Sequence, residues 1–167
     1  MAKKEEKTNV MRILDQKKIP YAARFYDETE SPLGDREYGV HVAALLGQDV
    51  SRVFKTLVGR SAKSYYVFVI PAAESLDLKK AAKAVGEKAV ELLAVRDLLP
   101  VTGYVRGGCS PIGMKKQFPT VFHSSVENGE TVSVSAGRIG AQVTLAPADI
   151  LALLRADVCD ITVEEAP

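Results

Sequence analysis

The chain has few of the residues that build disulfide frameworks and metal sites: among its 167 residues are two cysteines and two histidines. Cys109 and Cys159 lie fifty residues apart, and neither forms a Cys-x-x-Cys motif or clusters with His41 or His123. Ligands scattered in this way do not have the spacing of a zinc site. We therefore expect two free thiols, and neither a metal nor a cofactor.

Long apolar runs are also missing. The charged stretch at residues 1–7 is not followed by the apolar segment of a signal peptide. No apolar stretch further along reaches the length that a membrane span requires. These two absences predict a cytoplasmic protein that does not enter a membrane.

A strong charge of either sign is absent as well. Lys and Arg number 22 and Asp and Glu number 21, which gives a formal net charge of +1. Such a balance excludes a protein that holds nucleic acid by bulk positive charge. The hydrophobic fraction of 47% excludes a disordered chain. Length and composition together predict one globular domain over residues 8–163, after a polar tail at residues 1–7.

Local patterns predict short helices and short strands in mixed order. Thr8, Asp77 and Pro147 have the residue types that begin helices, and Gly47 and Gly86 have the type that ends them. Helices are expected at residues 8–18, 38–46, 77–85, 96–99 and 147–155. Strands are expected at residues 21–26, 53–59, 65–70, 89–94, 120–124, 131–135, 141–145 and 158–163, and a polar loop at residues 28–34. This pattern predicts an α+β domain whose mixed, curved, barrel-like sheet is surrounded by helices.

Three segments combine polar side chains with costly backbone features. Lys55 shares a strand face with Val53 and Leu57, so it lies either on an exposed sheet face or in a cleft. The glycine-rich segment 103–113 is either a structural turn or a loop whose amides bind an anion. The segment 134–140 either caps a strand end or delivers the Ser135 hydroxyl to the rim of a site.

A protein nucleophile is the competing interpretation of the same segments. Ser110, Ser135 or Cys109 could be paired with His123, but no Gly-x-Ser-x-Gly elbow surrounds either serine. His123 is expected within a strand, at the surface or hydrogen-bonded. Catalysis without a protein nucleophile is therefore preferred.

The charges are unevenly distributed along the chain. Residues 50–73, 98–126 and 131–148 contain eight Lys and Arg residues but no Asp or Glu, and they include all three candidate segments. If these segments converge in space, they form a mildly positive cleft suited to a phosphate or a developing oxyanion.

The ordered set of motifs resembles the YbaK family of aminoacyl-tRNA deacylases, in particular its free-standing Cys-tRNA(Pro) deacylases. The resemblance covers about Thr8 to Ile161 and rests on four segments: Val53–Leu57, Leu76–Lys83, Thr102–Gly113 and Val134–Arg138. It implies a compact α+β domain related to the editing domain of prolyl-tRNA synthetase. It also implies editing in trans, in which the ester of mischarged tRNA, Cys-tRNA(Pro) in the first place, is cleaved.

The resemblance also implies roles for particular residues. Lys55 corresponds to the functional lysine of the family. The implied substrate-binding residues are Tyr26, Tyr38, Thr56, Gly107, Gly108, Ser110, Pro111, Ser135 and Gly137. Three residues depart from the family pattern, namely Tyr38, Cys109 and Gln142, and they bear on which amino acid is removed.

An aminoacyl ester is already activated, so positioning and charge stabilisation can supply the rate. We expect the amides of Gly107 and Gly108 to polarise the ester carbonyl and Lys55 to hold the terminal phosphate or ribose. Water or the substrate's own thiol would attack. The alternative is a non-catalytic module on the same fold that binds a small ligand or a partner. The expected partners are the aminoacylated 3′ end of tRNA and prolyl-tRNA synthetase, which would supply the rest of the tRNA affinity.

Overall fold

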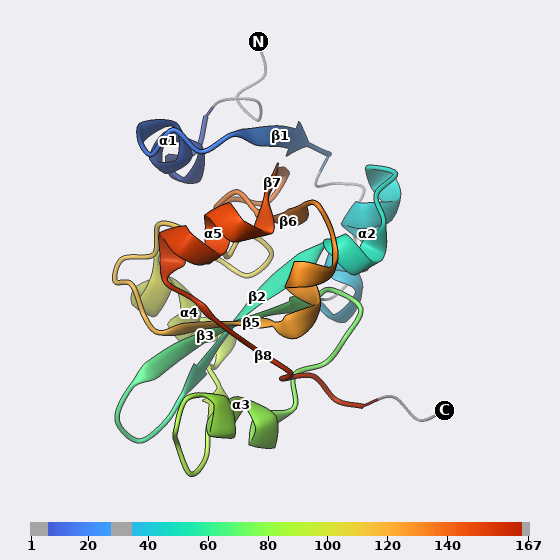
Figure 1. Ribbon diagram of the computed structural model, residues 1–167. Coiled ribbons are helices and arrows are strands. Elements are labelled where there is room, and N and C mark those ends of the chain that lie inside the picture. The colour runs from blue at the N-terminus through green and yellow to red at the C-terminus, as the bar shows by residue number, and fades with distance from the viewer. Residues whose placement is uncertain (1–6, 28–34, 165–167) are drawn as a thin grey trace.

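A computed structural model of the chain describes residues 7–27 and 35–164 (Figure 1). Its five α-helices are α1 (Asn9–Gln16), α2 (Asp35–Leu45), α3 (Leu78–Ala84), α4 (Val95–Thr102) and α5 (Pro147–Leu154). Two 3₁₀ helices, η3 (Val50–Arg52) and η4 (Ser124–Asn128), accompany them. The strands are β1 (Tyr21–Phe25), β2 (Phe54–Arg60), β3 (Tyr65–Pro71), β4 (Glu91–Leu92), β5 (Thr120–His123), β6 (Val132–Ser135), β7 (Ala141–Leu145) and β8 (Asp157–Cys159). The predicted loop at residues 28–34 and most of the predicted tail lie outside the described residues.

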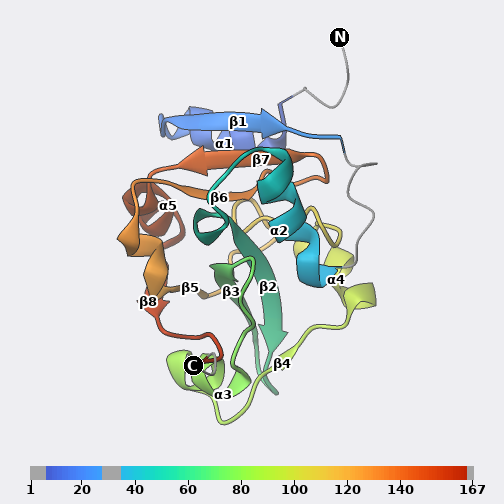
Figure 2. The same cartoon turned by 90° about the vertical axis from the view of Figure 1, so that its right-hand side faces the viewer.

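The strands form two sheets. One has the order β1-β7-β6 and is antiparallel. The other has the order β4-β2-β3-β5-β8, in which β2 pairs antiparallel with β3 and β4, while β3-β5 and β5-β8 are parallel. A single parallel bridge between Val53 and Ser133 connects the two sheets. Figure 2 shows the three-stranded sheet above and the β2–β3 hairpin running down from it towards α3.

The α+β class with mixed strand directions is confirmed, whereas the barrel-like sheet is realised as two sheets that do not close. The main core lies between them and contains Val10 and Leu14 of α1, Phe54 and Val58 of β2, and Phe122 of β5. A second cluster, around Phe68 and Ile70, packs beneath α3. The bridge at Val53 therefore holds β2 at the junction between the two sheets.

Local sequence signals determine several helix ends. The Thr8 hydroxyl accepts a hydrogen bond from the amide of Met11, and the Asp77 carboxylate accepts from the amides of Lys79 and Lys80. Gly86, at φ +73°, follows α3 in the left-handed conformation. These helix boundaries are confirmed to within one or two residues.

Four boundaries differ from the prediction. Helix α2 begins at Asp35, three residues before the expected start at residue 38. The expected strand 89–94 is reduced to β4, because only Glu91 and Leu92 find partners on β2. Helix α4 continues through Pro100 to Thr102, whose hydroxyl donates to the carbonyl of Leu98, and it ends at left-handed Gly103. The last strand is Asp157–Cys159 rather than 158–163.

The C-terminal segment leaves the sheet because its backbone pairs with residues 75–77 instead. The Asp77 amide donates to the Ile161 carbonyl, the Val163 amide donates to the Ser75 carbonyl, and Thr162 forms an isolated bridge with Leu76. Within residues 7–27 and 35–164, no helix combines the length and apolar character needed to cross a membrane.

Candidate active site

A cavity of about 800 Å³ opens where α2, the edge of β2, the β4–α4 segment, the glycine loop and the β6–β7 pair meet. It gathers residues from most of the chain. The lining residues are Tyr26, Tyr38, Gly39, Val42, Val53, Phe54, Lys55, Thr56, Leu57, Val58, Leu92, Leu93, Val95, Leu98, Arg106, Gly107, Cys109, Val134, Ser135, Ile139, Ala141 and Gln142. All three candidate segments of the sequence therefore contribute to one cavity.

One edge of β2 is open along this cavity. The other edge pairs with β3 along its whole length, but β4 covers only Gly59 and Arg60. The amide of Leu93 donates to the carbonyl of Val58, so the peptide groups of Val58 face β4. Because alternate residues of a strand face the same edge, the peptide groups of Thr56 face it too, beyond the end of β4.

Lys55 and Thr56 are consecutive residues of this strand, so their side chains leave it on opposite faces. Both are half-buried and both line the cavity. The Thr56 Oγ1 atom is buried and has no hydrogen-bond partner among the described residues. A buried hydroxyl without a partner costs free energy, and a ligand would relieve that cost only where the cavity lining shifts enough to expose Oγ1 to it.

The glycine loop contributes fewer lining residues than predicted. Gly107, at φ +85°, lines the cavity. The amide of Gly108 instead donates to the carbonyl of Val105 at 3.0 Å, so the expectation that this amide polarises the substrate carbonyl is wrong. A Cβ atom on Gly108 would lie 2.9–3.0 Å from the backbone of Arg138, which explains why the loop requires glycine there.

Ser110 and Pro111 are buried in the loop and do not line the cavity. The Ser110 hydroxyl accepts a hydrogen bond from the Ile112 amide, and the Tyr104 hydroxyl donates to the Ile112 carbonyl at 2.6 Å. Burial raises the pKa of Tyr104 to about 12, which keeps this donor protonated. These hydrogen bonds within the loop fix its shape.

Two tyrosines and one serine that were predicted as site residues, Tyr26, Tyr38 and Ser135, line the cavity. The Tyr26 and Tyr38 hydroxyls lie 2.7 Å apart, which ties the end of β1 to α2. The Ser135 hydroxyl accepts a hydrogen bond from the Gly137 amide at 3.2 Å. Gly137, at φ +98°, packs against Tyr104 and Val10 rather than lining the cavity.

Several lining residues were not among the predicted site residues. Arg106 and Gln142 are the polar ones, and Leu92, Val95 and Leu98 form an apolar side of the cavity. Arg106 could have been found, since it lies in the glycine loop within an acid-free window. The leucines and Val95 carry no such signal, because they resemble ordinary helix and strand residues in the sequence.

The structure argues against the competing hypothesis of a protein nucleophile paired with His123. Burial raises the pKa of the Cys109 thiol to about 12, so a thiolate is strongly disfavoured at neutral pH. His123 ends β5 and contacts Ser125, Thr162 and Asp160. Its two ring nitrogens are thus engaged away from Ser110, Ser135 and Cys109.

The described residues that line the cavity carry charges of one sign. Among the described residues that line it, Lys55 and Arg106 are cationic and none is acidic. The described residues also contain no group of three or more His, Cys, Asp or Glu side chains that could hold a metal ion. The cavity therefore suits an anionic ligand or a transition state in which negative charge develops.

The chain was compared with models of known protein families. Residues 39–153 match the aminoacyl-tRNA editing domain. This chain belongs to that family. The matched range includes most of the cavity lining, from Gly39 through Lys55 and Arg106 to Gln142.

A protein of Enterococcus faecalis assigned as a Cys-tRNA(Pro)/Cys-tRNA(Cys) deacylase, EbsC, is 46% identical over 99% of this chain and 100% of its own length. A crystal structure described as a trans-editing enzyme for prolyl tRNA synthetase covers 95% of this chain and 100% of its own, with a TM-score of 0.79 and 21% identity. A protein described only as hypothetical covers 93% and 100%, with a TM-score of 0.80 and 22% identity. The two structural likenesses establish a shared fold.

Proposed function

We propose that this chain is an aminoacyl-tRNA deacylase that edits in trans and that its substrate is Cys-tRNA(Pro). Membership of the editing-domain family and 46% identity to the Enterococcus faecalis deacylase support the activity and the substrate class. The observation that carries the proposal is the cavity, in which Lys55, Arg106, the open edge of β2 and the glycine loop meet with no acidic side chain among its described lining residues.

Lys55 would act on the terminal nucleotide. It lines the cavity on the part of β2 that β4 leaves uncovered. An ammonium group there attracts the terminal phosphate and stabilises negative charge on the ester oxygens as it develops. Arg106, on the glycine loop, adds a second positive charge to the same cavity.

Two amides of the glycine loop can serve the ester carbonyl. Gly107 and Cys109 line the cavity, and their amides donate no hydrogen bond within the described residues. The Gly108 amide between them is engaged by Val105. We assign carbonyl polarisation to Gly107 and Cys109, with Gly108 maintaining the turn that presents them.

No protein nucleophile is needed in this scheme. The aminoacyl ester is activated, and holding it against these donors supplies orientation and charge stabilisation. Water or the cysteine thiol of the substrate attacks the carbonyl carbon, and the ribose oxygen leaves with a proton. Attack by the thiol releases a cyclic thiolactone, whereas attack by water releases free cysteine, so product analysis distinguishes the two.

The test is a deacylation panel with tRNA(Pro) carrying cysteine, alanine, serine or proline. We expect Cys-tRNA(Pro) to be turned over in preference to correctly charged Pro-tRNA(Pro). Binding of the charged tRNAs without turnover of any would contradict a deacylase and identify the alternative, a binding module. Preferred turnover of Pro-tRNA(Pro) would contradict editing.

We also propose prolyl-tRNA synthetase as a partner. The net charge of +1 gives this chain little general affinity for a whole tRNA, so its own contacts centre on the aminoacylated 3′ end. A synthetase that holds the rest of the tRNA would supply the missing affinity. Addition of prolyl-tRNA synthetase should then lower the KM for Cys-tRNA(Pro) without changing kcat, while an unrelated synthetase should have no effect.

A further inference from the structure

Two glutamines form a reciprocal amide pair at the wall of the cavity. Gln48 Nε2 donates to Gln142 Oε1 at 2.6 Å, and Gln142 Nε2 donates back to Gln48 Oε1 at 3.2 Å. Gln142 lines the cavity and is only 4% exposed. The pair connects positions that are 94 residues apart in the sequence.

Both backbones of this pair are rigidly held. Gly47, at φ +66°, and Gln48 end α2, with their amides donating to the carbonyls of Ala44 and Ala43 in the pattern of a Schellman motif. Gln142 lies inside β7 and pairs with Arg24 on one side and Ser135 on the other. Because neither end can shift without breaking backbone hydrogen bonds, the amide of Gln142 has a fixed orientation.

The pair leaves part of the Gln142 amide unused. A carboxamide has two N–H donors and an oxygen with two lone pairs, and the reciprocal pair uses one of each. Since Gln142 is buried and lines the cavity, a molecule in the cavity is the natural partner of the remaining donor and lone pair. This part of the wall is thus polar, neutral and able both to donate and to accept.

We infer that Gln142, oriented by Gln48, determines which aminoacyl side chain the cavity accepts, and that it selects small side chains ending in a thiol or hydroxyl. Such a group donates and accepts as Gln142 does. A methyl group leaves the buried amide unsatisfied, which a site built for hydrogen bonding penalises. This inference rests on the proposed function, since it concerns the aminoacyl group of the same substrate.

The test separates binding from chemistry. tRNA(Pro) carrying cysteine, serine or alanine through a non-hydrolysable amide at its 3′ end is titrated into the wild-type protein and three variants. Gln142→Leu removes the polar wall, Gln48→Leu removes only its orientation, and Gln16→Leu on the exposed face of α1 is the matched control.

The wild type and Gln16→Leu should bind the cysteine and serine forms roughly tenfold more tightly than the alanine form. Gln142→Leu should weaken the cysteine and serine forms about tenfold while changing the alanine form less than about threefold. Gln48→Leu should change the same ratio by a smaller factor. A merely structural role would instead weaken all three forms equally and lower Tm.

Equal affinity of the wild type for the three amides, or an unchanged ratio in Gln142→Leu, would overturn the inference. The proposed function is checked separately by deacylation of Cys-tRNA(Pro) with the wild type. Failure of that reaction while the binding preference persists would leave Gln142 as the selector of a binding module rather than of an enzyme.

Discussion

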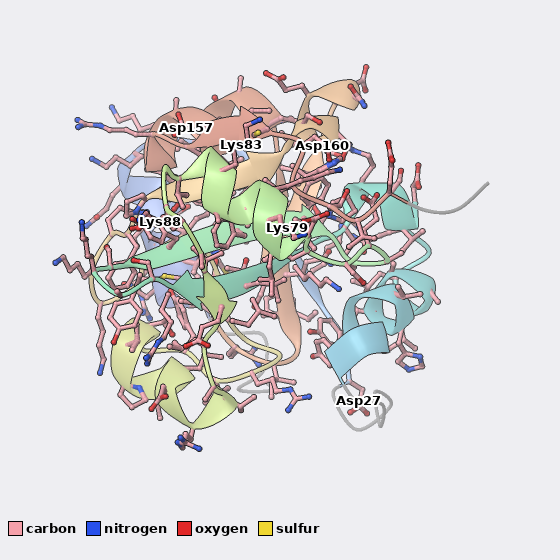
Figure 3. The ribbon with its side chains drawn as sticks, turned by 90° about the horizontal axis from the view of Figure 1, so that it is seen from below. Asp27, Lys79, Lys83, Lys88, Asp157 and Asp160 are labelled. Atoms are coloured by element: carbon pink, nitrogen blue, oxygen red, sulfur yellow. The ribbon has the colours of Figure 1, made fainter. Side chains whose placement is uncertain are left out.

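The cavity and the surface around α3 differ in how their charges are arranged. At α3, Lys80 contacts Asp160 at 3.1 Å and the Thr162 carbonyl at 2.9 Å. Figure 3 shows Lys79 and Lys83 on α3, while Asp27 lies well away, next to α2. The described residues that line the cavity include Lys55 and Arg106 and no acidic residue.

The difference shows how a nearly neutral chain can carry an anion site. At the α3 face, Lys80 pairs with Asp160 and holds the C-terminal segment in place. The described residues that line the cavity include the cationic Lys55 and Arg106 and also Thr56, whose buried Oγ1 atom has no hydrogen-bond partner among the described residues. A buried hydroxyl in that state costs stability and calls for an explanation, of which a functional role is one.

Replacing one lysine in each region by alanine should give the largest difference in deacylation rate. Lys55→Ala removes the positive charge at the strand edge, and we expect kcat/KM for Cys-tRNA(Pro) to fall by about 100-fold or more. Lys83→Ala on the exposed side of α3 should leave deacylation unchanged. Initial rates and thermal unfolding are measured together. Retained activity of a natively folded Lys55→Ala variant would remove Lys55 from the proposed mechanism.

Alanine substitutions at two glycines, one in the cavity loop and one after α3, should give the next largest difference. Gly108→Ala would place a Cβ atom 2.9–3.0 Å from the Arg138 backbone, and we expect it to destabilise the fold by about 1–3 kcal/mol and to reduce kcat by moving the neighbouring amides. Gly86→Ala, after α3, meets no atom within 4 Å, and its left-handed φ costs about 1–2 kcal/mol. Denaturant unfolding and single-turnover rates separate the two. Full activity in folded Gly108→Ala would show that the loop shape is not critical.

Two threonines provide a test of the unsatisfied hydroxyl. Thr56→Val removes the buried Oγ1 that has no partner in the described structure, so stability should stay equal or rise by up to about 1 kcal/mol while kcat/KM falls about tenfold. Thr144→Val breaks a 2.7 Å contact with the Ser133 hydroxyl and should cost about 1 kcal/mol with activity intact. A stability loss in Thr56→Val without a change in rate would assign that hydroxyl a structural role.

The smallest effect is expected from the α3 face. The hydrogen bond from Lys80, above all, lowers the pKa of the Asp160 carboxyl. A depressed folded-state pKa stabilises the fold above the unfolded value and is lost as the pH falls through the folded value. Because the Asp160 side chain is 59% exposed, Asp160→Asn should cost less than about 1 kcal/mol at pH 7.

This difference in stability should vanish in acid, once the pH has fallen below the depressed folded-state pKa of Asp160 and both proteins carry a neutral side chain at position 160. Unfolding of the two proteins between pH 2 and pH 7 measures it. Deacylation at neutral pH should not change. A pH-independent gap would mean that the Asp160 side chain acts through packing rather than charge.

The sequence by itself determined the local features of this protein. Side-chain caps such as Thr8 and Asp77 act within a few residues, so the helix starts could be predicted from short patterns. The motif residues Lys55, Gly107 and Ser135 were identified from their sequence neighbours, and the structure brings them to one cavity. The acid-free windows likewise predicted the sign of its charge.

Only the tertiary structure decided which atoms of those motifs face the cavity. Gly108 lies within the predicted loop, yet its amide closes a turn onto Val105. The open edge of β2 exists because β4 pairs with just Gly59 and Arg60, which no strand pattern specifies. The Gln48–Gln142 pair joins a helix end to a distant strand. Such features depend on how separate elements pack, and long-range packing is not encoded in the spacing of neighbouring residues.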